Sequence, residues 1–219
     1  SQVNRHSAIA DRTASQSASR QSTCEKGLSY QRQLIKHCRA CGSAVLYRLP
    51  DDGGTKERAV CSTCHLVHYE NPLNVVGTVP YLGQRVLLCK RNIEPRKGKW
   101  TLPAGFMELG ESTAQGAARE TTEEAGAHFN IGNLFTVMSV PRVGQVHLYY
   151  LAELLNEDFS PGFETQEAKM FSESEIPWDE LAFRTVQETL KHNFEDQKSG
   201  KFYHQNSPKI QNVCQAGRT

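Results

Sequence analysis

The stretch GFMELGESTAQGAARETTEEAGA, residues 105–127, decides how this chain is interpreted. It contains five Glu but only one cation, Arg119. Ser112 and Gln115 have the spacing of a capping box, and Gly126 suits a helix C-terminus, so we expect a helix between them. On such a helix the last three Glu share one face, and like charges that share a face repel each other unless a cation lies beside them.

These three carboxylates, Glu120, Glu123 and Glu124, predict a site for a divalent cation. Mg²⁺ takes oxygen ligands, keeps several waters and commonly bridges to substrate phosphates. Arg119 is placed to reach back to Glu111, a structural contact that ties the helix to the loop before it.

Two CxxC pairs, Cys38 with Cys41 and Cys61 with Cys64, predict a second metal site. The 19 residues between the pairs are long enough for a hairpin that brings the four thiolates together. Four thiolates give the closed tetrahedral coordination of structural Zn²⁺. The alternatives are a redox CxxC and a ribbon that has lost its metal. In a zinc site, His65 or His68 could also replace a cysteine as ligand. A module of about 35 residues buries little core, so the metal would supply its folding energy.

The opening stretch fits the Nudix box, Gly-x5-Glu-x7-Arg-Glu-U-x-Glu-Glu-x-Gly-U, where U is usually a bulky aliphatic residue. The two U positions hold Thr121 and Ala127, which departs from the pattern but removes no ligand. With the CxxC pairs, the chain resembles Nudix hydrolases with an N-terminal zinc ribbon, such as the FAD and ADP-ribose pyrophosphatases of the NADH-pyrophosphatase-like group. All fixed positions of the box are present: Gly105, Glu111, Arg119, Glu120, Glu123, Glu124 and Gly126.

The resemblance covers roughly residues 36–200 and implies an α/β fold. We expect a Nudix α/β/α sandwich over residues 71–205, preceded by a small zinc-ribbon β module over residues 36–70. Residues 1–35 are expected to be a disordered tail and residues 206–219 a flexible one. Within the sandwich, the sequence predicts a loop over 159–169 that leads into a short strand, and an amphipathic helix over 179–194.

The resemblance implies metal-dependent hydrolysis of the pyrophosphate bond in a dinucleotide or nucleoside diphosphate derivative, FAD or ADP-ribose above all. The products would be AMP and the other phosphorylated half. The cofactors would be catalytic Mg²⁺ or Mn²⁺ and structural Zn²⁺. In this reading Glu124 is the principal ligand of the catalytic ion, Glu120 is a ligand or a base, and Glu123 assists. An NADH pyrophosphatase and a NAD- or RNA-cap hydrolase are the alternative enzymes, and a nucleotide-sensing regulator is the alternative that is not an enzyme.

Further site residues are expected on either side of the box. Family members often take another carboxylate from a later loop, and Glu167 is preferred over Glu164 for that role. Arg91 and Arg96, in the basic stretch KRNIEPRKGKW, are candidates to bind phosphates, and a solvated basic loop is the alternative. Gly105 and Phe106 are further substrate-binding candidates, Phe106 as a ring for a base to stack on.

Composition narrows the partners and the compartment. The formal net charge of the 219 residues is +1, so nucleic acid is an unlikely partner and a small dinucleotide is the expected one. No apolar run approaches the roughly 20 residues of a membrane span, so no membrane contact is expected. Seven Cys, four of them in pairs, favour a reducing, cytoplasmic location. A plastid or mitochondrion is the alternative if the Ser- and Arg-rich N-terminus is a transit remnant, and a homodimer is expected by resemblance.

Overall fold

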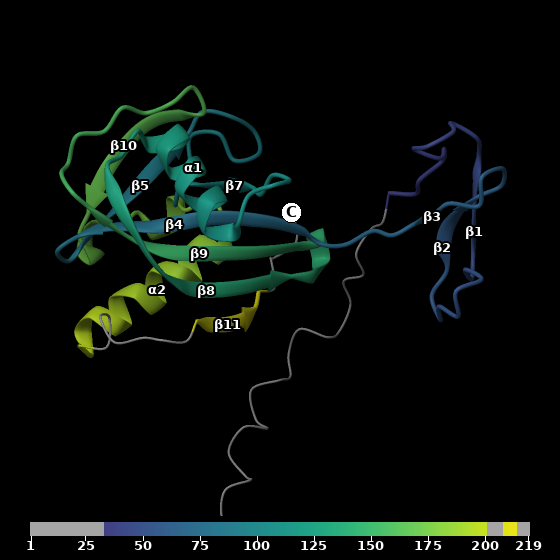
Figure 1. Ribbon diagram of the computed structural model, residues 1–219. Coiled ribbons are helices and arrows are strands. Elements are labelled where there is room, and N and C mark those ends of the chain that lie inside the picture. Colours follow the sequence, from purple (N-terminus) through teal and green to yellow (C-terminus); the bar gives the residue numbers. More distant parts are fainter. Residues whose placement is uncertain (1–32, 201–207, 214–219) are drawn as a thin grey trace, which may run out of the picture.

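The computed structural model describes residues 33–200 and 208–213. The prediction of disorder over residues 1–35 therefore lies almost wholly outside the described residues. Within the described residues, no helix is long and apolar enough to cross a membrane. Figure 1 shows two parts, a small β module and a larger α/β domain, joined by the chain between β3 and β4.

The small module is a three-stranded antiparallel sheet in the order β1-β2-β3. Its strands are β1 (Val45–Arg48), β2 (Arg58–Cys61) and β3 (Val67–His68). The only wholly buried stretch is at the end of β2, where Ala59, Val60 and Cys61 are at most 1% exposed. So small an apolar core cannot stabilise a fold of this size alone, as the sequence suggested.

The large domain is built on one mixed sheet in the order β10-β5-β4-β9-β8-β11, with β6 paired to β5 and β7 to β4. In chain order the elements are β4 (Leu73–Leu82), β5 (Arg85–Arg91), β6 (Trp100–Thr101), β7 (Ala104–Phe106), α1 (Thr113–Ala125), β8 (Phe129–Val140), η1 (Pro141–Val143), β9 (Gln145–Leu154), β10 (Thr165–Phe171), η2 (Glu173–Glu175), η3 (Trp178–Glu180), α2 (Arg184–Lys198) and β11 (Lys209–Asn212).

The two helices lie on opposite faces of this sheet, α1 above and α2 below in Figure 1. On the α2 side, Val186, Leu190 and Phe194 pack against sheet residues that include Leu88 and Tyr149. A smaller apolar cluster lies at the C-terminal end of α1 and includes Ala125, Leu87 and Cys89. The expected α/β/α sandwich with a small β module before it is confirmed.

Three predicted boundaries were wrong. The helix expected over 179–194 begins at Arg184, because the backbone of Leu181 pairs with Trp100 and Ala182 N donates to Trp100 O at 2.8 Å, which holds that segment extended. The expected loop 159–169 ends early, because β10 starts at Thr165 and pairs with β5. Residues 209–212 form β11 instead of part of a flexible tail, since they pair in parallel with β8.

Candidate active site

Helix α1 is fixed at both ends as its sequence suggested. Gln115 N donates to Ser112 Oγ at 3.2 Å, and Ser112 N donates to Gln115 Oε1 at 2.8 Å, which completes the capping box. Gly126 adopts the left-handed conformation at φ 57° and ends the helix. A Cβ on Gly116 would lie 2.9 Å from Val76 Cγ2, so only glycine permits this close approach of the helix to β4.

Arg119 joins the helix to the preceding loop. Its Nε and Nη2 donate to the two oxygens of Glu111 at 3.0 and 2.9 Å, a bidentate contact. Glu111 also accepts from Glu108 N at 2.7 Å. The hydrogen bonds from Arg119 are the main reason why the pKa of Glu111 is lowered to about 2. This geometry supports the structural role expected for Arg119 and Glu111.

Two of the three helix carboxylates are largely withdrawn from water. Glu124 is 8% exposed, and burial raises its pKa to about 8, with a smaller contribution from the charge of Glu120. Burial also raises the pKa of Glu120, although Arg119 Nη1 donates to it at 2.7 Å and opposes the shift. A bound cation would offset the cost of ionising these groups. The chemistry of this donor set therefore fits a hard divalent ion.

The backbone around β7 makes room for these side chains. Strand β4 pairs with β5 only near their connecting turn and pairs with β7 farther along, so β4 and β5 diverge there. Glu124 reaches this divergence, where its Oε2 accepts from Ala104 N at 3.1 Å. A Cβ on Gly105 would lie 2.3 Å from Glu120 Oε2, so Gly105 is needed to admit that carboxylate.

The carboxylates do not form a closed cage. Glu123 is 60% exposed and accepts from Arg119 Nη1 at 3.1 Å. In the part of the chain that the structure describes, only the four cysteines bring three or more ligand atoms within 4.8 Å of one another. An open pair of carboxylates suits Mg²⁺, which is usually bound by one or two carboxylates plus waters and substrate phosphates.

The loop before β10 brings Glu164 to the site. Its charge raises the pKa of both Glu120 and Glu124. Glu167, preferred from the sequence, pairs with Lys90 on β5, one position away from the Ala168–Cys89 pair that faces the end of α1. Successive strand residues point to opposite faces, so Glu167 points away from α1. The sequence favoured Glu167 because it lies three residues before Met170, but an odd spacing along a strand puts the two side chains on opposite faces.

Of the predicted substrate-binding residues, Arg91 is the one joined electrostatically to the carboxylates. Its charge lowers the pKa of Glu124, against the upward effect of burial. Its Nε donates to Pro95 O at 2.9 Å, and its Cζ lies 5.2 Å from the centre of the Phe183 ring. Arg96 is exposed on the connecting loop at φ 69°. Phe106 is 53% exposed and accepts through its backbone oxygen from Arg119 Nη2.

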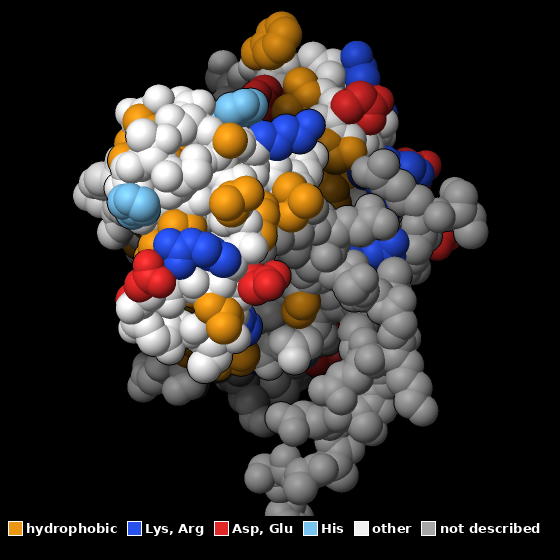
Figure 2. Space-filling model, turned by 90° about the vertical axis from the view of Figure 1, so that its right-hand side faces the viewer, with side chains coloured by type: hydrophobic (Ala, Val, Ile, Leu, Met, Phe, Trp, Pro, Cys, Tyr) orange, Lys and Arg blue, Asp and Glu red, His pale blue; other side chains and the backbone are white. Residues whose placement is uncertain are grey.

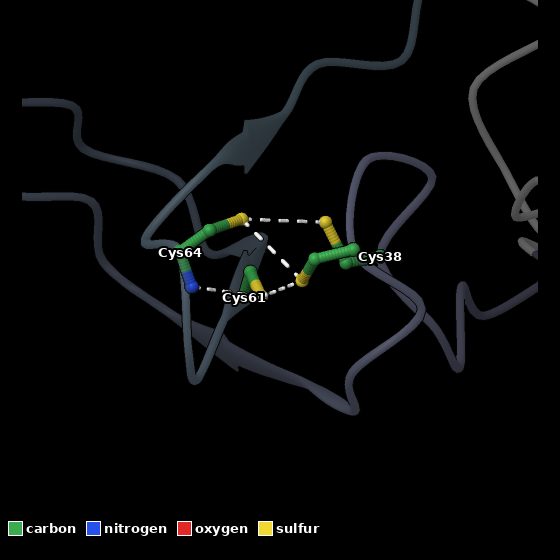
Figure 3. Close-up of side chains that lie close together, drawn as sticks. Cys38, Cys61 and Cys64 are labelled. Carbon is green, nitrogen blue, oxygen red and sulfur yellow. Dashed lines mark hydrogen bonds between the residues drawn. The ribbon is translucent and has the colours of Figure 1, made fainter.

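The four cysteines of the small module converge on one point (Figure 3). Cys41 Sγ lies 3.4 Å from Cys61 Sγ and 3.6 Å from Cys64 Sγ, and Cys38 Sγ lies 3.6 Å from Cys64 Sγ. Zinc–sulfur bonds of about 2.3 Å in a tetrahedron place sulfurs about 3.8 Å apart. The observed spacing fits a Cys₄ zinc site, and neither His65 nor His68 belongs to the group.

Comparison with known proteins agrees with both parts. The family model described as NUDIX domain matches residues 72–202, and the model described as Nudix N-terminal, a zinc ribbon, matches residues 36–70. A NUDIX hydrolase from Nitrosomonas europaea has a solved structure that is 45% identical, with a TM-score of 0.75. The match covers 82% of this chain and 99% of that one.

Curated relatives are more distant. An ADP-ribose pyrophosphatase from Methanocaldococcus jannaschii is 29% identical over 52% of this chain and 69% of its own length. An NAD-capped RNA hydrolase NudC from Vibrio parahaemolyticus is 24% identical over 66% of this chain and 54% of its own length. This chain thus spans about half the length of that NudC relative. From the two family matches, the intact box and the Cys₄ cluster, we conclude that the chain belongs to the Nudix hydrolase family and carries the Nudix N-terminal zinc ribbon.

Proposed function

We propose that this chain hydrolyses the pyrophosphate bond of a dinucleotide or nucleoside diphosphate derivative, with FAD or ADP-ribose as substrate. The products are AMP and the other phosphorylated half. One observation carries the proposal: Glu120 and Glu124 are largely withdrawn from water at a place where the sheet opens, and the charge of Arg91 acts on Glu124. Such a site can hold a cation and a phosphate side by side.

Glu120 and Glu124 are the proposed ligands of Mg²⁺ or Mn²⁺, and exposed Glu123 assists. Glu164 takes the place that the sequence gave to Glu167, because its charge acts on both ligands. A bound divalent ion offsets phosphate charge, polarises the phosphoryl oxygen and lowers the pKa of water. The protein's own contribution is to orient the carboxylates and to shield them partly from bulk water.

Arg91 is the proposed phosphate-binding side chain. Among the described residues neither of its Nη nitrogens makes a hydrogen bond or ion pair, while its Nε is held by Pro95 O. Its charge is therefore oriented by the protein and its outer nitrogens are left for an anion. Arg96 and the exposed ring of Phe106 are proposed as secondary contacts, to a distal phosphate and to a base.

The choice of substrate rests on relatives and on charge. A relative named ADP-ribose pyrophosphatase favours ADP-ribose, and relatives named NAD-capped RNA hydrolase favour the alternative that NADH or a capped RNA is cleaved. RNA binding depends on a basic surface. On the face shown in Figure 2, Lys and Arg alternate with Asp and Glu among apolar side chains, with no broad basic patch over the described atoms. A small dinucleotide is the better fit.

The proposal is tested by incubating the purified chain with FAD, ADP-ribose, NADH, CoA and NAD-capped RNA, with Mg²⁺ or Mn²⁺. AMP released from FAD or ADP-ribose at the highest kcat/KM is the expected result. Preferential cleavage of NADH or capped RNA would select the alternative enzyme. Tight nucleotide binding without AMP under any condition would instead identify a nucleotide-sensing regulator. Size-exclusion chromatography with light scattering tests the proposed homodimer in the same preparation.

A further inference from the structure

A buried chain of hydrogen bonds, which the proposed reaction does not require, joins the first turn of α2 to strand β9. Thr185 is 0% exposed, and its Oγ1 lies 3.1 Å from His147 Nδ1. Tyr149, two residues farther along β9, is buried beside this pair at 2% exposed. His147 Nε2 lies 2.9 Å from Gln145 Oε1. His147 and Gln145 on β9 are thus tied to one threonine on the helix.

The proton positions in this chain follow from burial. Burial lowers the pKa of His147 to about 4, so the ring is neutral near pH 7 and has one donor and one acceptor nitrogen. Gln145 Oε1 accepts from Nε2–H, which leaves Nδ1 to accept from the Thr185 hydroxyl. Every member of the chain has a partner, and all the bonds run in one direction.

This hydroxyl anchors a helix whose start is otherwise poorly capped. The N-cap residue of α2 is Phe183, whose side chain makes no capping hydrogen bond. Thr185, two residues later, provides the polar attachment to β9. The Phe183 ring packs against the core below and lies 5.2 Å from Arg91 Cζ above. The position of Phe183, and with it one of the two contacts that hold Arg91, therefore depends on where α2 begins.

Arg91 connects this turn to the candidate active site. Its Cζ lies 5.2 Å from the centre of the Phe183 ring at the start of α2, and its charge lowers the pKa of Glu124. A guanidinium over an aromatic face is attracted to the electrons of the ring, so the Phe183 ring helps to hold Arg91 in place. If the Phe183 ring moved, the Nη nitrogens of Arg91 would no longer be oriented to bind a phosphate.

We propose that Thr185 is a positioning residue: it fixes the first turn of α2, so that Phe183 holds Arg91 in place for the substrate's phosphate. The proposal rests on the proposed function for the part that concerns substrate. It assigns no chemical step to Thr185, which touches neither the carboxylates nor the substrate. Its effect belongs to substrate binding and not to the rate of the chemical step.

The test compares two isosteric substitutions one helical turn apart. Thr185→Val removes the anchoring hydroxyl. Thr189→Val is the matched control, because Thr189 is also 0% exposed and bonds a sheet hydroxyl, Thr136 Oγ1, at 3.1 Å. With ADP-ribose we expect Thr185→Val to raise KM roughly five- to tenfold with kcat within about twofold. Thr185→Ser should restore KM, and Thr189→Val should leave KM unchanged despite a similar loss of thermal stability.

A second measurement does not depend on turnover. The Nε–H resonance of Arg91 in ¹⁵N-labelled protein, assigned with Arg91→Lys, should shift in Thr185→Val and stay in place in Thr189→Val. If wild-type protein cleaves no dinucleotide, the proposed function fails while this resonance still tests the positioning. An unmoved Arg91 resonance overturns the inference, and so does a KM that responds equally to both valine substitutions.

Discussion

Thr121 occupies a position at which the Nudix box usually has a bulky aliphatic side chain. The structure shows why a hydroxyl is tolerated there: Thr121 Oγ1 lies 2.7 Å from Thr78 Oγ1 on β4, and both residues are 0% exposed. Thr121 Oγ1 also donates to Ala117 O at 2.8 Å, which leaves it to accept from Thr78. Two buried hydroxyls satisfy each other where other members have apolar contact.

Replacing one partner of this pair should therefore cost more than replacing both. Thr121→Val leaves the Thr78 hydroxyl buried without a partner, and we expect a loss of about 1–3 kcal/mol in the free energy of unfolding. Thr78→Val with Thr121→Val should return to within about 1 kcal/mol of wild type. Urea denaturation of wild type, the two single variants Thr78→Val and Thr121→Val, and the double variant measures the coupling between the two hydroxyls. If the two single losses simply add in the double variant, the pair contributes nothing.

Glu124 allows the sharpest test of the proposed metal site. Glu124→Gln keeps the hydrogen bond from Ala104 N but removes the charge of the proposed principal ligand. We expect kcat/KM to fall by more than about 100-fold, since loss of even an outer partner of a metal ligand costs about 10- to 100-fold. The melting temperature should be unchanged or higher, because a buried carboxylate has become a neutral amide.

Glu167→Gln is the matched control for that experiment, as it removes a carboxylate that points away from α1. It should keep activity within about threefold of wild type, whereas Glu164→Gln should lower it. Near-normal turnover by Glu124→Gln would contradict its role as a ligand. A severe loss in Glu167→Gln with little effect of Glu164→Gln would return the role to the residue favoured by the sequence.

His147 predicts how stability depends on pH. Burial depresses its pKa from 6.5 to about 4, so the unfolded chain binds the proton more readily between these values. The stability from neutral His147 is complete above about pH 6.5 and is lost as the pH falls towards 4, by about 3 kcal/mol in all. We expect this part of the dependence of the free energy of unfolding on pH to disappear in His147→Gln. Unfolding curves for both proteins between pH 4 and 7 measure the difference, and parallel slopes would rule it out.

At the level of elements, the sequence predicted most where local chemistry decides the structure. The ends of α1 follow from Ser112, Gln115 and Gly126, which act within one turn of the residues they cap. The start of α2 could not be read in the same way, because pairing of Leu181 with Trp100, 81 positions earlier in the chain, outweighs the helical pattern. The position of Glu164 also depends on a distant partner, because Asn92 N, 72 positions earlier in the chain, donates to its backbone oxygen at 2.7 Å.

Strand β11 gave no signal of its own, since KIQN has neither an apolar alternation nor a flanking turn motif. Its attachment is tertiary. Lys209 Nζ lies 2.6 Å from the carboxylate of buried Asp196 on α2. Val213, just after the strand, is 3% exposed and packs with Met138 and Val140. The C-terminal segment thus covers one edge of the sheet.

A chain ending at residue 207 should therefore be less stable than the full chain. Loss of Val213 alone removes about 1.5–3 kcal/mol of burial, and Asp196 loses its cation as well. We expect the free energy of unfolding to fall by at least about 2 kcal/mol, with catalysis retained below the melting temperature. A chain ending at residue 213 is the control and should match the full chain in urea denaturation; equal midpoints for both truncations would show that β11 adds no stability.

At the scale of the molecule, the large domain and the small module are each stabilised in a different way. The large domain packs 13 buried side chains into the apolar cluster on its α2 side. The small module has a short buried stretch on β2 and four thiols that converge on one point. Its fold could be predicted because CxxC spacing constrains the chain, whereas the site in the large domain needed strands far apart in sequence to meet.

Cys38→Ser separates these two sources of stability. It removes one of four ligands, and a structural zinc site supplies folding free energy that the small module lacks otherwise. We expect zinc content measured by mass spectrometry to fall well below one ion per chain. Limited proteolysis should then cut within residues 36–70 while residues 72–200 survive. Because the carboxylates and Arg91 all belong to the large domain, turnover per surviving domain should remain within about threefold of wild type.

The control is Cys89→Ala, which removes a thiol outside the cluster and should leave zinc bound. A Cys38→Ser protein with one tightly held zinc would show that the cysteines do not bind it, and a large loss of turnover at full stability of residues 72–200 would show that the ribbon takes part in catalysis.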